Sequence, residues 1–252
     1  FNCPVGGGGG RIAYYYSGTN GFSGTLTANP GTDDAGCYVA GTKGTVIIKD
    51  TTNNDIYNKN TQTWSADPTR EGAIQTFKNV YVQDNSTLNL IGHYTSNVNG
   101  YGFTINATNL TIDSGSFIRA DGTGYAGGKN TNTIITNTLS DGAGSGGGQG
   151  NNCAATYAGG GGSYGGTGGN SSAATYGSLT APLDLGSGGG AGSVNTSCRP
   201  GGAGGGAIKL IVTDTLLVNG GITANGANVS NTGGAGSGGS LYIIAGTINS
   251  SV

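Results

Sequence analysis

Short runs of apolar, β-branched and aromatic residues recur along the chain, separated by polar residues and glycine. The clearest runs are Thr45–Lys49, Val80–Val82, Ile208–Val212 and Leu241–Ile244. Such runs between turn-forming residues are typical of β-strands. Residues that favour helices are scarce, since Glu occurs only at position 71 and Met is absent. The pattern therefore predicts an all-β chain, with its most regular strands over residues 74–122 and 207–252.

An internal repeat organises these strands. Residues Gly9–Asn29 align without a gap with Gly205–Asn225, at a constant offset of 196 positions. A looser copy spans Leu110–Gly122, and a fourth begins at Gly238. A unit of one or two short strands cannot bury its own apolar face, so copies must stack on one another. We therefore predict a parallel β-helix, or β-solenoid, that forms a single domain over residues 1–252.

Each copy ends in a small residue followed by a turn pair, for example Ala224-Asn225-Gly226 and Ala120-Asp121-Gly122. Asn-Gly and Asp-Gly tolerate positive φ and turn the chain sharply. The alternative is that these pairs form type I′ hairpin turns of an antiparallel sandwich. Against it, long glycine tracts follow the Asn-Gly sites, where a hairpin requires a second strand.

Glycine supplies 55 of the 252 residues and is concentrated in residues 123–206. Tyr157, Tyr164 and Tyr176 are set within this stretch, which has no apolar periodicity and so does not form a core. It is either a flexible linker or an ordered excursion packed on the strands. Extended three-fold glycine segments can pack closely, because only glycine permits such an approach. We expect partial order, with one further strand at Thr133–Leu139.

Three stretches together resemble a known type of repeat: GGRIAYYY with FSGTLTANPG, FKNVYVQDNSTLNL with LTIDSGSFIRADG, and GGAGGGAIKLIV with GGITANG. They are similar to the glycine-rich parallel β-helix repeats of large extracellular surface and adhesin-like proteins. The resemblance implies a β-solenoid displayed at a cell surface more than it implies any chemistry. Pro30, where glycine is usual, and the four cysteines depart from the pattern.

Charge and cysteine content restrict the partners and the compartment. The net charge is −2 and only 9% of residues are charged, which argues against nucleic acid and anionic membrane surfaces. No apolar stretch approaches the ~18 residues of a membrane span. The four cysteines, none in a Cys-x-x-Cys pair, suggest two disulfides and an oxidising, extracellular setting. Three connectivities are open; Cys3–Cys37 with Cys153–Cys198 is favoured because each closes a local loop.

Seven Asn-x-Ser/Thr sequons agree with a secreted glycoprotein, although a chain rich in these residues forms some by chance. Their asparagines are Asn85, Asn106, Asn109, Asn170, Asn195, Asn228 and Asn249.

The sequence offers no convincing catalytic, cofactor or metal site. Glycoside hydrolysis needs two facing carboxylates, and the candidates are Asp33-Asp34, Asp84, Asp113, Asp121 and Asp214. Asp33-Asp34 fits a solvated turn better than a calcium site, and Asp121 occupies a corner position. His93 is the only histidine and has no evident partner residue. We expect no enzymatic activity.

The sequence favours an extracellular structural protein, a subunit or segment of a surface fibre. The chain opens in a glycine tract and stops within a repeat, so its end turns are expected to stack head to tail on further copies. Tyr14 and Tyr16 share one face of a strand, on which packing in the core is expected, and Tyr15 lies on the other. Aromatic residues left exposed would contact a neighbouring subunit or sugar rings. The alternative is a carbohydrate-binding or carbohydrate-active β-helix adhesin. A third hypothesis, ice binding through rows of threonine residues, has less support in the sequence. Expected partners are copies of the chain and, less directly, glycans.

Overall fold

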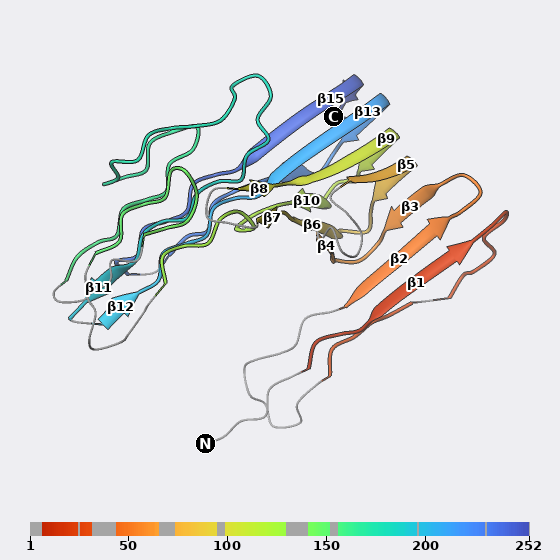
Figure 1. Ribbon diagram of the computed structural model, residues 1–252. Coiled ribbons are helices and arrows are strands. Elements are labelled where there is room, and N and C mark those ends of the chain that lie inside the picture. Colours follow the sequence, from red (N-terminus) through yellow and green to blue (C-terminus); the bar gives the residue numbers. More distant parts are fainter. Residues whose placement is uncertain are drawn as a thin grey trace.

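The protein, seen in a computed structural model, is built from two facing β-sheets and a layer of extended glycine-rich segments (Figure 1). The structure describes residues 7–24, 26–31, 44–65, 74–94, 99–129, 141–151, 156–195, 197–229 and 231–251. The larger sheet, here the long sheet, has seven strands in the order β1 (Arg11–Tyr16), β2 (Thr45–Asp50), β3 (Asp55–Asn58), β5 (Ile74–Val82), β9 (Phe103–Ile112), β13 (Ala207–Val218) and β15 (Ser240–Asn249). The smaller, here the short sheet, has the order β14 (Gly221–Thr223), β10 (Phe117–Arg119), β6 (Thr87–Ile91) and β4 (Gln62–Ser65). Two hairpins join β7 (His93–Tyr94) to β8 (Gly100–Tyr101) and β11 (Gly192–Val194) to β12 (Ser197–Arg199).

Three of the four repeat copies, those beginning at Leu110, Gly205 and Gly238, lie side by side, whereas the strand β1 of the copy at Gly9–Asn29 pairs with β2 at the other end of the long sheet. In the long sheet, β13 pairs in parallel with β15, and Ala207 lies opposite Ser240. In the short sheet, β10 pairs in parallel with β14, and Ile118 lies opposite Ile222. The alternative of an antiparallel sandwich is wrong, because β2–β3 is the one antiparallel pair of the long sheet in the described part of the chain.

The predicted parallel β-solenoid is also wrong, because the two sheets stay open and the described residues form no closed coil. Successive units pass from the long to the short sheet at residues 83–86, 113–116 and 219–220. In a solenoid, each coil closes through a third side, in which the chain passes directly from the short sheet back to the long sheet. Here the chain returns through the β7–β8 hairpin or through extended segments that run beyond the ends of the sheets (Figure 1). Those segments are mostly glycine and have few apolar side chains to close the coil. The assignment of residues 1–252 to one domain stays a prediction.

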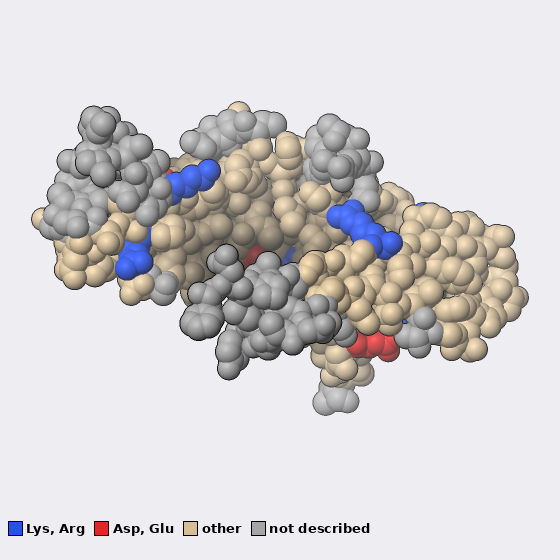
Figure 2. All heavy atoms as spheres, turned by 90° about the horizontal axis from the view of Figure 1, so that it is seen from below, with Lys and Arg blue, Asp and Glu red and all other residues tan. Residues whose placement is uncertain are grey.

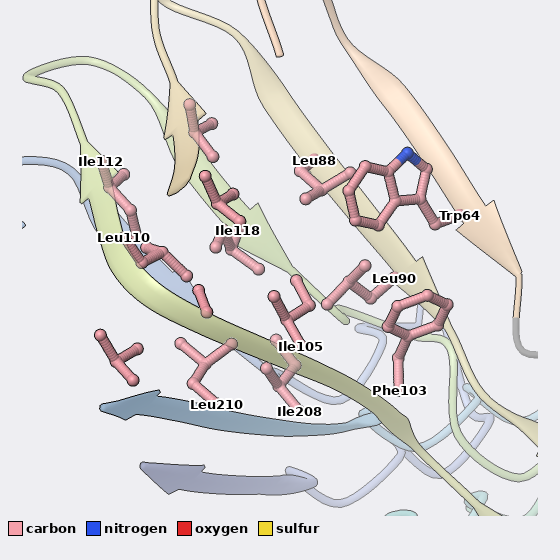
Figure 3. Packing of buried hydrophobic residues seen from close by; sticks show 14 of the residues in the cluster. Trp64, Leu88, Leu90, Phe103, Ile105, Leu110, Ile112, Ile118, Ile208 and Leu210 are labelled. Atoms are coloured by element: carbon pink, nitrogen blue, oxygen red, sulfur yellow. The ribbon is translucent and has the colours of Figure 1, made fainter. Parts of the chain in front are cut away.

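The hydrophobic core lies between the two sheets and comes from alternate residues of their strands (Figure 3). Phe103, Ile105 and Leu110 of β9 face Leu88 of β6 and Ile118 of β10, and all five are at most 1% exposed. Burying an aliphatic or aromatic side chain of this size contributes about 1.5–3 kcal/mol. The apolar alternation along each strand therefore fixes which face turns inward.

The corner position of Asp121 has the conformational role expected from the repeat. Its carboxylate accepts hydrogen bonds from the Asn225 backbone N–H at 2.6 Å and from the Thr223 hydroxyl at 2.9 Å. Both donors belong to the equivalent corner of the next repeat. The carboxylate thus joins two stacked corners, while Ala120 before it is buried in the core.

A ladder of polar side chains crosses four neighbouring strands of the long sheet. The Asn79 amide donates to Asp55 Oδ1 at 2.7 Å, and the Asn109 amide donates to Asn79 Oδ1 at 3.0 Å. The Thr215 backbone N–H then donates to Asn109 Oδ1 at 3.2 Å, next to a register shift in β13. Asn109 therefore accepts a hydrogen bond from the Thr215 N–H, which the register shift leaves outside the regular backbone pairing of β13 with β9.

Replacing Asn109 with alanine is expected to lower the free energy of unfolding by about 1–3 kcal/mol, because it leaves the side-chain carbonyl of Asn79 and the backbone N–H of Thr215 without their hydrogen-bond partner. Urea denaturation measures the loss. Asn228→Ala is the matched control, since Asn228 is exposed and its replacement is expected to change stability by less than about 0.5 kcal/mol. Equal effects of the two substitutions would contradict a structural role for the ladder.

The glycine-rich segments form an ordered bundle, here called the glycine layer, from residues 124–128, 142–150, 159–163, 186–191, 201–206, 226–229 and 231–239. Three successive N–H groups of its central segment point to three different neighbours: Gly188 donates to Ala143, Gly189 to Gly202 and Gly190 to Gly160, at 2.8–2.9 Å. A turn of about 120° per residue is the signature of a three-residue extended helix. Figure 1 shows these segments side by side, beyond the ends of the sheets.

The described part of residues 123–206 is therefore ordered, as expected, and the flexible-linker alternative is wrong for it. Residues 185–193, which include the central segment, are all buried. A Cβ on Gly188 would lie 2.0 Å from the Ala126 carbonyl oxygen. The absence of side chains is thus what lets the segments approach from every side. The strand expected at Thr133–Leu139 lies outside the described residues.

Tyrosine side chains fasten the glycine layer. The Tyr176 hydroxyl donates to the Leu185 carbonyl oxygen at 2.6 Å and shares a hydrogen bond with Ser187 Oγ at 2.8 Å. The Tyr164 hydroxyl shares a 2.6 Å hydrogen bond with Ser240 Oγ at the start of β15. The layer is thereby joined both to itself and to the edge of the long sheet.

Alkaline pH is expected to destabilise the fold through Tyr176. Burial raises the pKa of Tyr176 from 10.0 to about 12, despite the hydrogen bond with Ser187, which lowers it. A raised pKa means that the folded state holds the proton more tightly than the unfolded state. This contribution to stability is complete below pH 10 and is lost as the pH rises towards 12.

Urea denaturation across pH 8–12 measures this loss, and the absorbance of tyrosinate follows the titration. Tyr176→Phe removes the titrating hydroxyl, so its stability should fall less steeply with pH. An unchanged slope in this variant would contradict the assignment to Tyr176.

Candidate functional site

The two outer edges of the long sheet are open. Among the described residues, no strand pairs with the outer edge of β1 or of β15. Strand β1 is parallel to β2, β2 is antiparallel to β3, and the remaining strands follow β3 in parallel. Strand β1 therefore runs opposite to β15. Each edge offers unpaired backbone N–H and C=O groups to another strand.

Among the described residues, no strand of the short sheet covers the core beneath β15. Leu241 and Ile248 lie opposite Ile208 and Leu216 of β13, which are buried, and so they occupy the core side of β15. They are nevertheless 39% and 61% exposed. The short sheet ends at β14, and no described strand of it covers β15. None of the ten residues of β15 is charged, so the edge lacks the charges that usually discourage strand pairing.

At the opposite end of the long sheet lies a groove of about 600 Å³, here called the N-terminal groove. Its aromatic lining comes from Tyr16 of β1, Tyr57 of β3 and Phe22 of the segment after β1. The apolar Val46 and Ile48 of β2 also contribute. Its polar lining includes Asn20, Lys59, Asn60 and Asp84.

The aromatic wall of this groove is held by contacts among its own residues. The ring of Phe22 lies 5.5 Å from that of Tyr14, and the Phe22 backbone N–H donates to Asn20 Oδ1 at 3.0 Å. Tyr57 stacks on Tyr81 with ring centroids 4.8 Å apart. Burial raises the pKa of Tyr57 to about 12, and a hydrogen bond with Tyr16 adds to the effect. The Tyr57 hydroxyl is therefore neutral at physiological pH.

The tyrosine triplet of β1 divides between the two faces of the strand. Tyr14 and Tyr16 are half-buried on one face with their rings stacked, and Tyr15 on the other face is 61% exposed. This agrees with the expectation that Tyr14 and Tyr16 share the packed face.

The cysteine predictions are tested at one position. Cys198 in β12 is buried and disulfide-bonded. Cys3, Cys37 and Cys153 lie outside the described residues, so the pairing stays a prediction.

The structure separates the predicted glycosylation sites into two groups. Asn106 and Asn109 are half-buried in β9, and their amide nitrogens donate to Thr76 Oγ1 at 3.4 Å and to Asn79. The other five asparagines are exposed: Asn85, Asn170, Asn195, Asn228 and Asn249. Glycan occupancy stays a prediction, and the exposed group is better suited to accept it.

The candidate catalytic residues that the structure describes lie in different turns and strands, where each has a structural contact. Asp84 lies 3.9 Å from Lys59 Nζ, Asp214 accepts from the Thr215 hydroxyl, and His93 packs its ring on Tyr101. The Asp113 backbone carbonyl accepts a turn hydrogen bond from the Ser116 N–H. The pair at positions 33 and 34 lies outside the described residues. Within the described ranges, no three His, Cys, Asp or Glu side chains are grouped closely enough to hold a metal ion.

Charged side chains are sparse and separated on the face shown in Figure 2, which has no continuous basic patch. In the part of the chain that the structure describes, no helix has the length and apolar character needed to cross a membrane.

Comparison of the chain with protein-family models, with curated proteins and with solved structures gave no match. The resemblance to glycine-rich surface repeats therefore stays a prediction. Sequence reasoning missed the N-terminal groove, whose described lining comes from β1, β2, β3, the segments that follow β1 and β3, and Asp84. It had one available signal, the aromatic triplet of β1.

Proposed function

We propose that this protein is an extracellular structural protein whose copies associate end to end through the edges of the long sheet into a fibre. The observation that supports this most directly is β15, an uncharged edge strand of ten residues whose core-side Leu241 and Ile248 are exposed. Natural proteins usually protect such edges with charges, proline or bulges. A second copy stacked on β15 would bury these side chains.

The complementary surface is β1 at the other end of the same sheet. Because β1 runs opposite to β15, a copy added by translation along the sheet, with its strand directions preserved, brings β1 antiparallel to β15. Antiparallel pairing is slightly more stable per residue than parallel pairing. The contact joins two different surfaces, so it repeats without closing and extends a fibre.

Extracellular localisation is supported by the Cys198 disulfide, since such bonds persist in oxidising compartments. The five exposed sequons agree with it. In this proposal the chain is not an enzyme, and its carboxylates at Asp121 and Asp55 serve the fold through hydrogen bonds to the neighbouring repeat and the Asn ladder.

Electron microscopy of the purified protein over a range of concentrations tests the proposal. Rods that lengthen with concentration are expected, with the strands perpendicular to the fibre axis. Sedimentation velocity on the same samples should show a growing series of oligomers. Strictly monodisperse monomers at every concentration would refute end-to-end assembly.

A further inference from the structure

The N-terminal groove combines aromatic rings with uncommitted polar groups. Phe22 is 44% exposed at its rim, and Tyr16 and Tyr57 present half-buried rings along its wall. Its volume of about 600 Å³ lies within the range of about 300–1,000 Å³ that is usual for small-molecule sites. An aromatic ring gives a flat apolar surface at little conformational cost, which suits a ligand with an extended C–H face.

Hydrogen-bonding groups in the groove remain available for a ligand. Among the described residues, the Asn60 side chain makes no hydrogen bond. Asn20 uses its Oδ1 to accept from Tyr14 and Phe22, which leaves its amide nitrogen as a donor. Thr27 adds a hydroxyl. Amides and hydroxyls of this kind both donate and accept, so they match ligands whose hydroxyl groups do the same.

The charges of the groove do not favour strongly anionic ligands. Lys59 Nζ and Asp84 Oδ2 lie 3.9 Å apart, so the ammonium and the carboxylate offset each other. Both side chains are about half-exposed, at 46% and 64%, and each keeps hydrogen-bonding positions free for hydroxyl groups. A phosphate or polyanion would need an excess of positive charge, and Lys59 is the one cationic side chain in the described lining.

We infer that the N-terminal groove binds a short neutral oligosaccharide. A pyranose ring has C–H groups on its faces and hydroxyls around its rim. Its faces can stack on Phe22, Tyr16 and Tyr57, while its hydroxyls bond to the amides of Asn20 and Asn60 and to the Lys59–Asp84 pair. This activity goes beyond the structural role proposed above, and assembly through β15 does not require it.

Titration with neutral trisaccharides tests the inference, with cellotriose, mannotriose and chitotriose as probes and trigalacturonic acid as the anionic comparison. Isothermal titration calorimetry and saturation-transfer NMR on the full chain are the readouts. At least one neutral trisaccharide should bind with a millimolar or lower Kd, and the anionic one more weakly. No binding by any neutral probe, or tighter binding of the anion, would overturn the inference.

Two variants locate the site. Asn60→Ala removes one ligand hydrogen bond and should weaken binding about three- to tenfold, and Phe22→Ala removes a stacking surface and should weaken it about tenfold or more. Asn228→Ala, outside the described lining of the groove, should leave the Kd unchanged. A circular dichroism melt checks that Phe22→Ala is folded, and Asn60→Ala tests the site if it is not. Binding that is unaffected by Asn60→Ala and by a folded Phe22→Ala would overturn the assignment.

Discussion

Replacing Gly189 with alanine is expected to destabilise the protein by about 3–5 kcal/mol, through overpacking and strained hydrogen bonds. The new Cβ would lie 2.0 Å from the Gly234 carbonyl oxygen and 2.4 Å from its carbon. Both atoms belong to backbone, so neither moves without displacing a segment. Overpacking of this kind costs about 1–3 kcal/mol or more. The hydrogen bonds of Gly189 with Gly202 and Gly128 would be strained as well.

Thermal and urea denaturation measure the loss, which corresponds to a fall in Tm of roughly 6–20 °C at about 2–4 °C per kcal/mol. Gly165→Ala is the matched control. A Cβ there has no heavy atom within 4 Å, and the φ of Gly165 lies outside the left-handed region. This change should be neutral or slightly stabilising. If Gly189→Ala unfolds at the same temperature as Gly165→Ala, the glycine layer is not close-packed in solution.

Much of the sheet structure was predictable from local sequence. Alternation of apolar residues identified β9 and β13, and the aligned repeats gave the pairing of Ile118 with Ile222. Both follow from side-chain periodicity and from the need of each unit to bury its apolar face. The role of Asp121 followed from its corner position.

Closure of the coil was not predictable in the same way. Apolar periodicity indicates which strands stack, but it says nothing about the path between one unit and the next. That path is set by glycine segments, whose backbone groups have no side-chain pattern to mark their partners. The bond from Gly188 to Ala143 joins residues 45 positions apart with no signal in the sequence. The predicted solenoid failed for this reason, although its stacked units are present.

The same limitation hid the candidate sites. The N-terminal groove combines Tyr16, Asn60 and Asp84, which only the pairing of β1, β2, β3 and β5 brings together. The exposed core side of β15 depends on where the short sheet ends, which is a property of the whole fold. Local sequence could suggest an open edge but could not place Leu241 and Ile248 on its core side.

The glycine layer and the open edge support each other physically. Tyr164, directly after a segment of the layer, bonds to Ser240 at the start of β15, and the Gly239 backbone N–H of the layer donates to the Ala224 carbonyl oxygen at 2.8 Å. These contacts fix the entry to β15 although the described structure gives the strand a partner on one side alone. An edge strand held in this way loses little further conformational freedom on pairing, which favours association.

Replacing Ile248 with lysine is expected to abolish end-to-end assembly at concentrations where the unmodified protein forms fibres. In the proposed contact the core side of β15 is covered by the next copy, so an ammonium group there must be desolvated or displaced. Loss of the buried isoleucine alone costs about 1.5–3 kcal/mol. Since each 1.4 kcal/mol is about tenfold in affinity, the critical concentration should rise about ten- to hundredfold. Light scattering and electron microscopy measure it.

Ile74→Lys is the matched control for this variant. Ile74 is 62% exposed against 61% for Ile248, and it belongs to β5, an interior strand that pairs with β3 and β9. The two variants therefore share the substitution, the added charge and the starting exposure. They differ in position, since Ile74 lies opposite Thr104 on the outer face of an interior strand and Ile248 lies on the core side of the edge strand. Ile74→Lys should assemble like the unmodified protein. Equal loss of assembly in both variants would mean that the added charge alone causes it. Undiminished assembly of Ile248→Lys would exclude β15 from the contact between copies.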